Sequence, residues 1–266
     1  MKSLQRRSGR WILAIQASAE NGTVVKNQSS VTVSGSSEVN RIREAYVRRD
    51  QKTPPSKYSM FNTSALLKIQ EVHFQMLKAL RRFHYDDLAN RKLLEVGCGH
   101  GHWLRQFIQW GAKPKNIFGV DLLPDRIETG RKLLPSEVTI KCADASKLEF
   151  EDDSFDLVLE AVSFTSIFDM AMAKSIASEM SRVLKPGGAI LWYDFWVSNP
   201  QNPDVRGWNR REIEDLFPGL KINLRRITLA PPLGRVVGNI SVPLYRALSA
   251  VKFLTTHYLG VFQKPA

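Results

Sequence analysis

A glycine-rich string in the first half of the chain constrains the fold more than any other feature of the sequence. Residues 93–103 read Leu-Leu-Glu-Val-Gly-Cys-Gly-His-Gly-His-Trp, so an apolar strand pattern leads into glycines at positions 97, 99 and 101 and then into a helical pattern. Glycine has no Cβ, so the backbone can turn sharply there, and a ligand can lie against main-chain N–H groups at the start of a helix. The string predicts a ligand site at a strand-to-helix turn.

Strand and helix patterns alternate along the rest of the chain. Short apolar runs separated by amphipathic segments are typical of strand–helix units that build a parallel sheet. The predicted strands are 92–96, 117–121, 138–142, 156–160 and 189–195, with two further extended runs at 221–229 and 257–262. The predicted helices are 102–110, 125–133, 169–183 and 209–216, the last with Asn209 and Glu212 as a capping box.

The segment before the glycine string is predicted to be helical in part. Residues 16–37 are polar and have no helical period, which favours disorder. A short charged helix is expected from Arg41. A longer helix follows, capped by Asn62 or Thr63 and carrying an apolar stripe as far as Phe83.

Composition excludes several classes of protein. With 266 residues, 43% hydrophobic and 24% charged, the chain has the balance of a soluble globular protein. No apolar run reaches the roughly 18 to 20 residues of a spanning helix, and the apolar part of residues 11–15 is shorter than the roughly 7 to 15 residues of an export signal. Two cysteines provide neither a disulfide framework nor a metal-binding spacing, so a reducing, cytoplasmic location is expected.

Positive charge is concentrated at the two ends of the chain. The net charge is +12; residues 1–53 carry ten Lys/Arg against four Asp/Glu, and residues 221–266 carry seven Lys/Arg and no acid. This charge could bind a nucleic acid, an anionic small molecule or an anionic membrane surface. Equally, it could be solvated charge that only aids solubility.

Three acidic positions restrict which chemical groups the ligand can carry. Glu95 stands two residues before the first glycine, a place where a carboxylate disfavours a pyrophosphate but suits an ammonium group. Asp121 ends the second strand, where an acid can accept hydrogen bonds from both ribose hydroxyls. Asp144, followed by Ala145, can accept from the exocyclic amine of adenine. Amino acid, ribose and adenine together indicate S-adenosylmethionine.

The chain resembles the class I S-adenosylmethionine-dependent methyltransferases, in particular small-molecule enzymes related to ubiquinone and menaquinone biosynthesis. The matching strings are residues 95–101, 119–121, 142–145, 154–158 and 180–188. The resemblance covers roughly residues 41–266 and implies an α/β fold. This is a Rossmann-like, doubly wound, seven-stranded sheet in three α/β/α layers, mostly parallel, with the last strand antiparallel between the fifth and sixth.

The resemblance also implies a division of the chain. Residues 1–40 would form a disordered basic tail and residues 41–266 a single domain. Within it, residues 41–90 would be a helical cap, 92–195 the cofactor-binding half and 196–266 the acceptor-side half. The implied cofactor-binding residues are Glu95, Gly97, Cys98, Gly99, Gly101, Asp121, Leu122, Asp144, Ala145 and Glu160.

The expected reaction is an in-line methyl transfer to a small-molecule acceptor, without a metal. The acceptor group would be a hydroxyl of a secondary metabolite, sugar, quinone or lipid precursor, and a base within hydrogen-bond reach would assist. Asp194, His102 and His257 are the candidate catalytic residues. Each has a plainer alternative: His102 fills a loop, His257 pairs with backbone, and Asp194 faces away from the acceptor.

The acceptor pocket is expected to form from the amino-terminal helices, residues 196–208 and residues 231–252. Arginines concentrate near these segments, which favours an anionic acceptor and allows peripheral membrane contact. They are Arg206, Arg210, Arg211, Arg225, Arg226 and Arg235.

Three other functions share parts of this pattern. A nicotinamide-dependent oxidoreductase would need a G-x-G-x-x-G loop, which is missing. A nucleic-acid methyltransferase fits the basic ends, but the chain lacks an Asn/Asp-Pro-Pro-Tyr/Phe string, and no nucleic acid is expected. A protein that binds the cofactor without turnover ranks last, because the glycine loop is intact.

Overall fold

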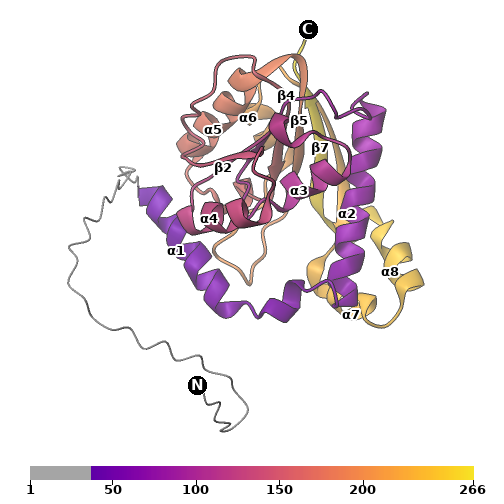
Figure 1. The fold of residues 1–266 in the computed structure, drawn as a ribbon. Coiled ribbons are helices and arrows are strands. Elements are labelled where there is room, and N and C mark those ends of the chain that lie inside the picture. Colours follow the sequence, from indigo (N-terminus) through magenta and orange to yellow (C-terminus); the bar gives the residue numbers. More distant parts are fainter. Residues whose placement is uncertain (1–36) are drawn as a thin grey trace, which may run out of the picture. The chain divides into compact units, whose positions relative to one another are not determined.

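A seven-stranded sheet forms the centre of the computed structural model, which describes residues 37–266 (Figure 1). Its strand order is β3-β2-β1-β4-β5-β7-β6, and only β7, which lies between β5 and β6, pairs antiparallel with its neighbours. The expected fold class is therefore confirmed. The strands are β1 (Leu93–Val96), β2 (Ile117–Asp121), β3 (Thr139–Cys142), β4 (Phe155–Ala161), β5 (Leu184–Phe195), β6 (Lys221–Leu229) and β7 (Thr255–Gln263).

Helices cover both faces of this sheet. The Asn62 side chain caps α2 by accepting from the Ser64 N–H, and Asn209 with Glu212 forms the predicted capping box of α6. The helices are α1 (Ser37–Lys52), α2 (Thr63–Arg82), α3 (His102–Gln109), α4 (Pro124–Leu133), α5 (Met170–Val183), α6 (Arg210–Leu216), α7 (Pro231–Gly238) and α8 (Val242–Ser249). Four 3-10 turns join them: η1 (Pro55–Tyr58), η2 (Pro114–Asn116), η3 (Phe164–Ser166) and η4 (Lys252–Leu254).

Beyond shifts of one or two residues at several ends, two element starts and two short helices differ from the sequence prediction. Helix α1 begins at Ser37, four residues before the predicted start, and the rest of the predicted tail lies outside the described residues. Strand β5 begins at Leu184 because Leu184 already pairs with Phe155, before a register shift leads into the Ala189–Leu157 pair. Helices α7 and α8 were not predicted, since each has only eight residues and therefore barely two turns of apolar period.

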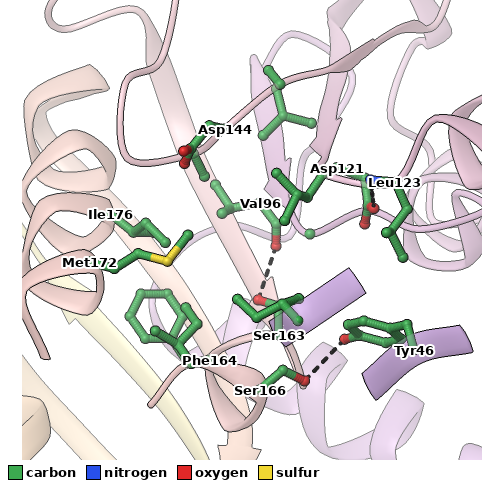
Figure 2. Close-up of a pocket in the computed structure, with 17 residues that line it drawn as sticks. Tyr46, Val96, Asp121, Leu123, Asp144, Ser163, Phe164, Ser166, Met172 and Ile176 are labelled. Carbon is green, nitrogen blue, oxygen red and sulfur yellow. Dashed lines mark hydrogen bonds between the residues drawn. The ribbon is translucent and has the colours of Figure 1, made fainter. Parts of the chain in front are cut away.

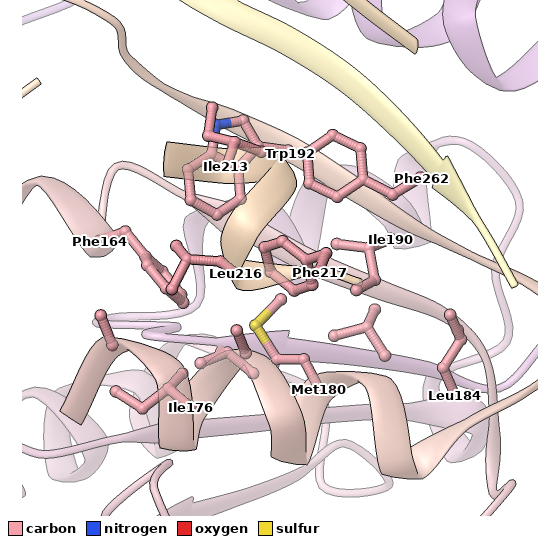
Figure 3. Close-up of a cluster of buried hydrophobic side chains, with 14 of the residues drawn as sticks. Phe164, Ile176, Met180, Leu184, Ile190, Trp192, Ile213, Leu216, Phe217 and Phe262 are labelled. Atoms are coloured by element: carbon pink, nitrogen blue, oxygen red, sulfur yellow. The ribbon is translucent and has the colours of Figure 1, made fainter. Parts of the chain in front are cut away.

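Two apolar layers separate the sheet from its helices. On one face Trp192 and Phe262 stack at 5.8 Å between ring centroids and pack with Phe164 and Phe217 against α5 and α6 (Figure 3). On the other face α2, α3 and α4 bury their own apolar sides, including Met76. Strands buried on both faces are typical of doubly wound sheets, and ligands of such sheets bind at the carboxyl ends of the strands.

Candidate functional site

A pocket lies at the carboxyl ends of β1, β2 and β3, where Figure 2 shows side chains from several loops pointing toward one space. We call it the edge pocket. Asp121 and Asp144 both line it, and Phe164, Met172 and Ile176 form an apolar wall. Helix α1 closes it with Ile42 and Tyr46, and the remaining lining residues are Val96, Gly97, Val120, Leu122, Leu123, Ala143, Ala145, Ser163, Ser166 and Ile167.

The glycine loop beside this pocket requires glycine for two separate reasons. Gly97, Gly99 and Gly101 all have positive φ, at 78°, 52° and 71°, a region that other L-residues rarely adopt. At Gly97 a Cβ would lie only 2.5 Å from Cβ of Ser163, so a side chain there would displace the opposite wall of the edge pocket. The loop therefore keeps main chain, rather than side chains, against the pocket.

Two aspartates fix the loops that follow the strands. The Asp121 carboxylate accepts from the Gly99 N–H at 2.8 Å and from the Leu123 N–H at 2.9 Å, which ties the glycine loop to the end of β2. Asp144 accepts from the Ser146 N–H at 2.9 Å and shapes the turn after β3. Both carboxylates still line the edge pocket, so each has acceptor capacity left for a ligand.

Five of the ten predicted cofactor-binding residues line the edge pocket and five do not. Gly97, Asp121, Leu122, Asp144 and Ala145 line it. Gly99 and Gly101 shape the glycine loop through their positive φ but do not line the pocket. The remaining three, Glu95, Cys98 and Glu160, are buried.

Glu95 and Cys98 lie beneath the glycine loop. Burial, the nearby Asp121 carboxylate and Glu160 raise the pKa of Glu95 well above its usual range, against a hydrogen bond from the Leu104 N–H. Burial also raises the pKa of the Cys98 thiol, which packs beside Gly119. Through its hydrogen bond from Leu104, Glu95 supports the start of α3, and the thiol acts as a small apolar filler.

Glu160 and Asp194 form a buried acid pair behind the pocket wall. Glu160 accepts from the Ser163 N–H at 2.7 Å and from the Phe164 N–H at 3.2 Å, while Asp194 accepts from the Thr165 N–H at 2.7 Å. Burial raises the pKa of Glu160 to about 7. Burial, and then the adjacent Glu160 carboxylate, raise the pKa of Asp194 well above its usual range. The pair positions η3, in which Phe164 and Ser166 line the edge pocket.

The structure does not bring the three candidate catalytic residues into the edge pocket. Asp194 lies behind η3. His102 lies in an outer cluster with His73 and Trp103, at 6.0 and 5.2 Å between ring centroids. His257 is fully buried and stacked on Tyr193 at 4.8 Å, and burial lowers the pKa of its ring well below the usual range.

A second cavity of about 470 Å³ adjoins the edge pocket. We call it the basic cavity. Tyr46 and Ser166 line both spaces, and the Ser166 hydroxyl donates to the Tyr46 hydroxyl at 3.2 Å. Residues of α1, η1 and the loop at 201–205 form its wall, with four cationic side chains, Arg48, Arg49, Lys52 and Lys57.

The arginines expected at the acceptor pocket serve other purposes. Arg206 pairs with Glu212 and lies 4.0 Å over the Trp208 ring. Arg225 donates to the Gln75 carbonyl at 2.6 Å, and Arg226 lies over Trp196 at 4.0 Å. None of these three lines the edge pocket or the basic cavity, whereas Arg235 lines a smaller cavity with Tyr58. From the sequence, the basic residues of α1 were expected only to form a charged helix.

Two features of residues 37–266 bear on other functions. No group of three or more His, Cys, Asp or Glu side chains in this range is placed to hold a metal ion. None of the helices in this range is both long and apolar enough to cross a membrane.

Comparison with known proteins identifies the domain around the edge pocket. Residues 93–188 match a family model described as a methyltransferase domain. A demethylmenaquinone methyltransferase of Staphylococcus aureus is 29% identical over 169 residues, which are 62% of this chain and 65% of that protein. The chain thus matches just under two thirds of the length of such relatives.

Solved structures agree with this fold. A putative methyltransferase of Haloferax volcanii, solved with the activator Trm112, superposes with a TM-score of 0.54 at 20% identity, covering 85% of this chain and 98% of that one. An S-adenosylmethionine-dependent methyltransferase of Methanosarcina mazei has a TM-score of 0.52 at 17% identity, covering 70% of this chain and 97% of that one. These solved structures share the fold, and the methyltransferase-domain match agrees with the resemblance seen in the sequence.

Proposed function

We propose that this chain, whose residues 93–188 match a methyltransferase domain, binds S-adenosylmethionine in the edge pocket and methylates a small-molecule acceptor. The observation that carries the proposal is the arrangement of Gly97, Asp121 and Asp144 around one pocket with an apolar wall. Main-chain donors, a ribose-binding acid and an adenine-side acid then lie along one sheet edge, in the order of the cofactor's own groups.

The residues present suit that cofactor. Gly97 keeps side chains away from the loop, so the amino-acid end can approach main chain. Asp121 would accept from the ribose hydroxyls. Asp144 would accept from the adenine amine, and the ring would lie against Met172 and Ile176. Glu95 is shielded beneath the loop and would influence the ammonium group only indirectly.

The cofactor supplies a methyl group on a positively charged sulfur, and this methyl is already electrophilic. The protein must therefore hold the acceptor in line and keep water out. Helix α1 covers the edge pocket and is fixed at three places: Glu38 accepts from the Phe168 N–H at 2.6 Å, Arg48 pairs with Asp204 and Asp50 pairs with Arg126. Tyr46 and Ser166 stand where the two spaces meet, so their hydroxyls would orient the acceptor oxygen.

The basic cavity supports an anionic acceptor. Arg48 is already paired with Asp204, but Lys52 and Lys57 make no ion pair with any residue in the range 37–266. A carboxylate or phosphate on the acceptor would meet these free ammonium groups while its reacting oxygen reached Tyr46. The demethylmenaquinone methyltransferase relatives further support a quinone-like ring as the methylated part.

Calorimetric titration tests cofactor binding directly. We expect S-adenosylmethionine and S-adenosylhomocysteine to bind and NAD not to bind. Tight NAD binding, or no binding of the two sulfur nucleosides, would overturn the assignment. Incubation with methyl-labelled cofactor and fractionated host extract, followed by mass spectrometry of the labelled product, would then identify the acceptor and the atom that is methylated.

A further inference from the structure

Large apolar side chains are exposed together at one end of the molecule. Phe61 is 102% exposed, Ile240 76%, Tyr58 60%, Val236 60% and Met60 50%. We call these five residues the apolar tip. Single exposed apolar side chains are normal on a protein surface, but a group of this size marks an interaction site.

The two segments that carry the tip lie against each other. Helix α7 crosses the start of α2 so closely that a Cβ on Gly238 would lie 2.9 Å from the Ser64 Cα. Phe61 comes three residues before Ser64, and Ile240 comes two residues after Gly238. Figure 1 shows the first turn of α2 and α7 side by side at the lower end of the molecule.

The two segments that form the tip carry only basic charged residues, and Glu71, the acid next to them, already accepts from the Thr228 N–H and the Tyr245 hydroxyl. Residues 53–70 and 230–254, which form this end, contain five Lys/Arg and no Asp/Glu. Exposed aromatic and aliphatic side chains rimmed by cations are the pattern of a surface that inserts shallowly into an anionic lipid interface. A protein partner would need a complementary acidic and apolar face, whereas an anionic bilayer supplies both properties at once. The five basic residues are Lys57, Lys68, Arg235, Arg246 and Lys252.

The tip is also continuous with the proposed acceptor site. Lys57 and Tyr58 line the basic cavity and, on their other side, a smaller cavity with Pro231, Gly234 and Arg235. A surface seated on the tip would therefore lie beside the opening of the basic cavity.

We propose that the apolar tip docks this protein on anionic membranes, with Phe61 and Ile240 inserted among the lipids. The docking itself does not depend on methyl transfer. If the proposed function holds, the acceptor is an amphiphile that reaches the basic cavity directly from the bilayer surface.

Vesicle co-sedimentation of the full-length chain tests the proposal without any assay of activity. One set of vesicles is pure phosphatidylcholine and the other contains roughly one third phosphatidylglycerol, at low and at high salt. We expect binding to the anionic set only, weakened by salt. The double variant Phe61→Asp/Ile240→Asp should bind roughly tenfold more weakly or not at all. Leu133→Asp on α4, a side chain that is 52% exposed away from the tip, is the matched control and should bind as the wild type does.

Three results would overturn the proposal. The wild type could fail to bind anionic vesicles. The double variant could bind as well as the wild type, which would assign binding to another part of the chain. Sedimentation velocity could show a dimer that the double variant converts to a monomer, in which case a second copy of the chain covers the tip. The melting temperature of each variant, compared with that of Leu133→Asp, identifies any variant that is simply misfolded.

Discussion

The carboxylate of Glu160 accepts a hydrogen bond of 2.7 Å from the backbone N–H of Ser163. Through this bond Glu160, which does not line the edge pocket, determines the backbone path of Ser163, which does. Asp194, on the neighbouring strand β5, accepts from the backbone N–H of Thr165, which lies between two residues that line the edge pocket, Phe164 and Ser166. Both acids are fully buried, and burial raises the pKa of each, so the groups that hold this wall of the edge pocket bind a proton more readily than exposed carboxylates do.

This arrangement predicts a pH-dependent stability. The pKa of Glu160 is about 7 in the folded chain against an ordinary 4.5, so the folded state binds the proton more tightly. The resulting stabilisation is complete below pH 4.5 and is lost as the pH rises toward 7. Glu160→Gln keeps an acceptor for Ser163 and removes the titration. Between these pH values the wild type should lose about 1 to 3 kcal/mol more than the variant.

Urea unfolding at a series of pH values measures that difference. Glu149→Gln, which changes an acid on the surface, serves as the control because its side chain is 77% exposed. Parallel stability curves for the wild type and Glu160→Gln would show that Glu160 does not hold the proton.

Gly97→Ala should strongly weaken cofactor binding. Its Cβ would lie 2.5 Å from Ser163 and its φ of 78° is strained for alanine. Gly111→Ala separates these effects, since Gly111 has a φ of 101° but nothing within 4 Å of a Cβ. We expect both variants to lose about 1 kcal/mol or more of stability. Only Gly97→Ala should weaken calorimetric binding of S-adenosylmethionine, by roughly a hundredfold; an equal effect of both variants would refute a steric role for Gly97.

The sequence predicted the sheet well because its signals are local. Residues 117–121 were predicted as a strand and form β2 with those bounds. The cap at Asn62 and the capping box at Asn209 likewise depend on residues three or fewer positions apart. Glycines with positive φ were found at 97, 99 and 101 because no other residue serves such a turn as well.

The candidate site was only partly predictable, because its composition depends on distant pairing. Arg206 was expected at the acceptor, yet Glu212 and Trp208 occupy its guanidinium. Tyr46 reaches the edge pocket only because α1 folds back across the carboxyl ends of the strands, and no local pattern encodes that path. A charged helix just before the domain was the only signal for the basic cavity.

Two substitutions distinguish the basic cavity from the predicted arginine cluster. Lys52→Ala together with Lys57→Ala removes two unpaired cations from the basic cavity and should raise the acceptor KM roughly tenfold or more with little change in melting temperature. Arg206→Ala breaks an ion pair and a ring contact, so it should lower the melting temperature and leave the acceptor KM nearly unchanged. Initial rates and thermal melts, measured once the acceptor is known, check both. The reverse pattern would place the anion at Arg206.

The hydroxyl of Tyr46 should matter for the rate of methyl transfer. Tyr46→Phe retains the ring, which lies between the Arg49 and Arg126 guanidinium groups at 4.2 and 4.3 Å, and removes only the oxygen that meets Ser166. We expect kcat to fall roughly tenfold, with unchanged calorimetric affinity for the cofactor. His257→Phe is the comparison, since this histidine is buried and the lowered pKa of its ring makes it a poor base. It should leave kcat within about twofold. If His257→Phe remained folded and lost kcat while Tyr46→Phe did not, the reacting oxygen would have to lie on the other face of the sheet.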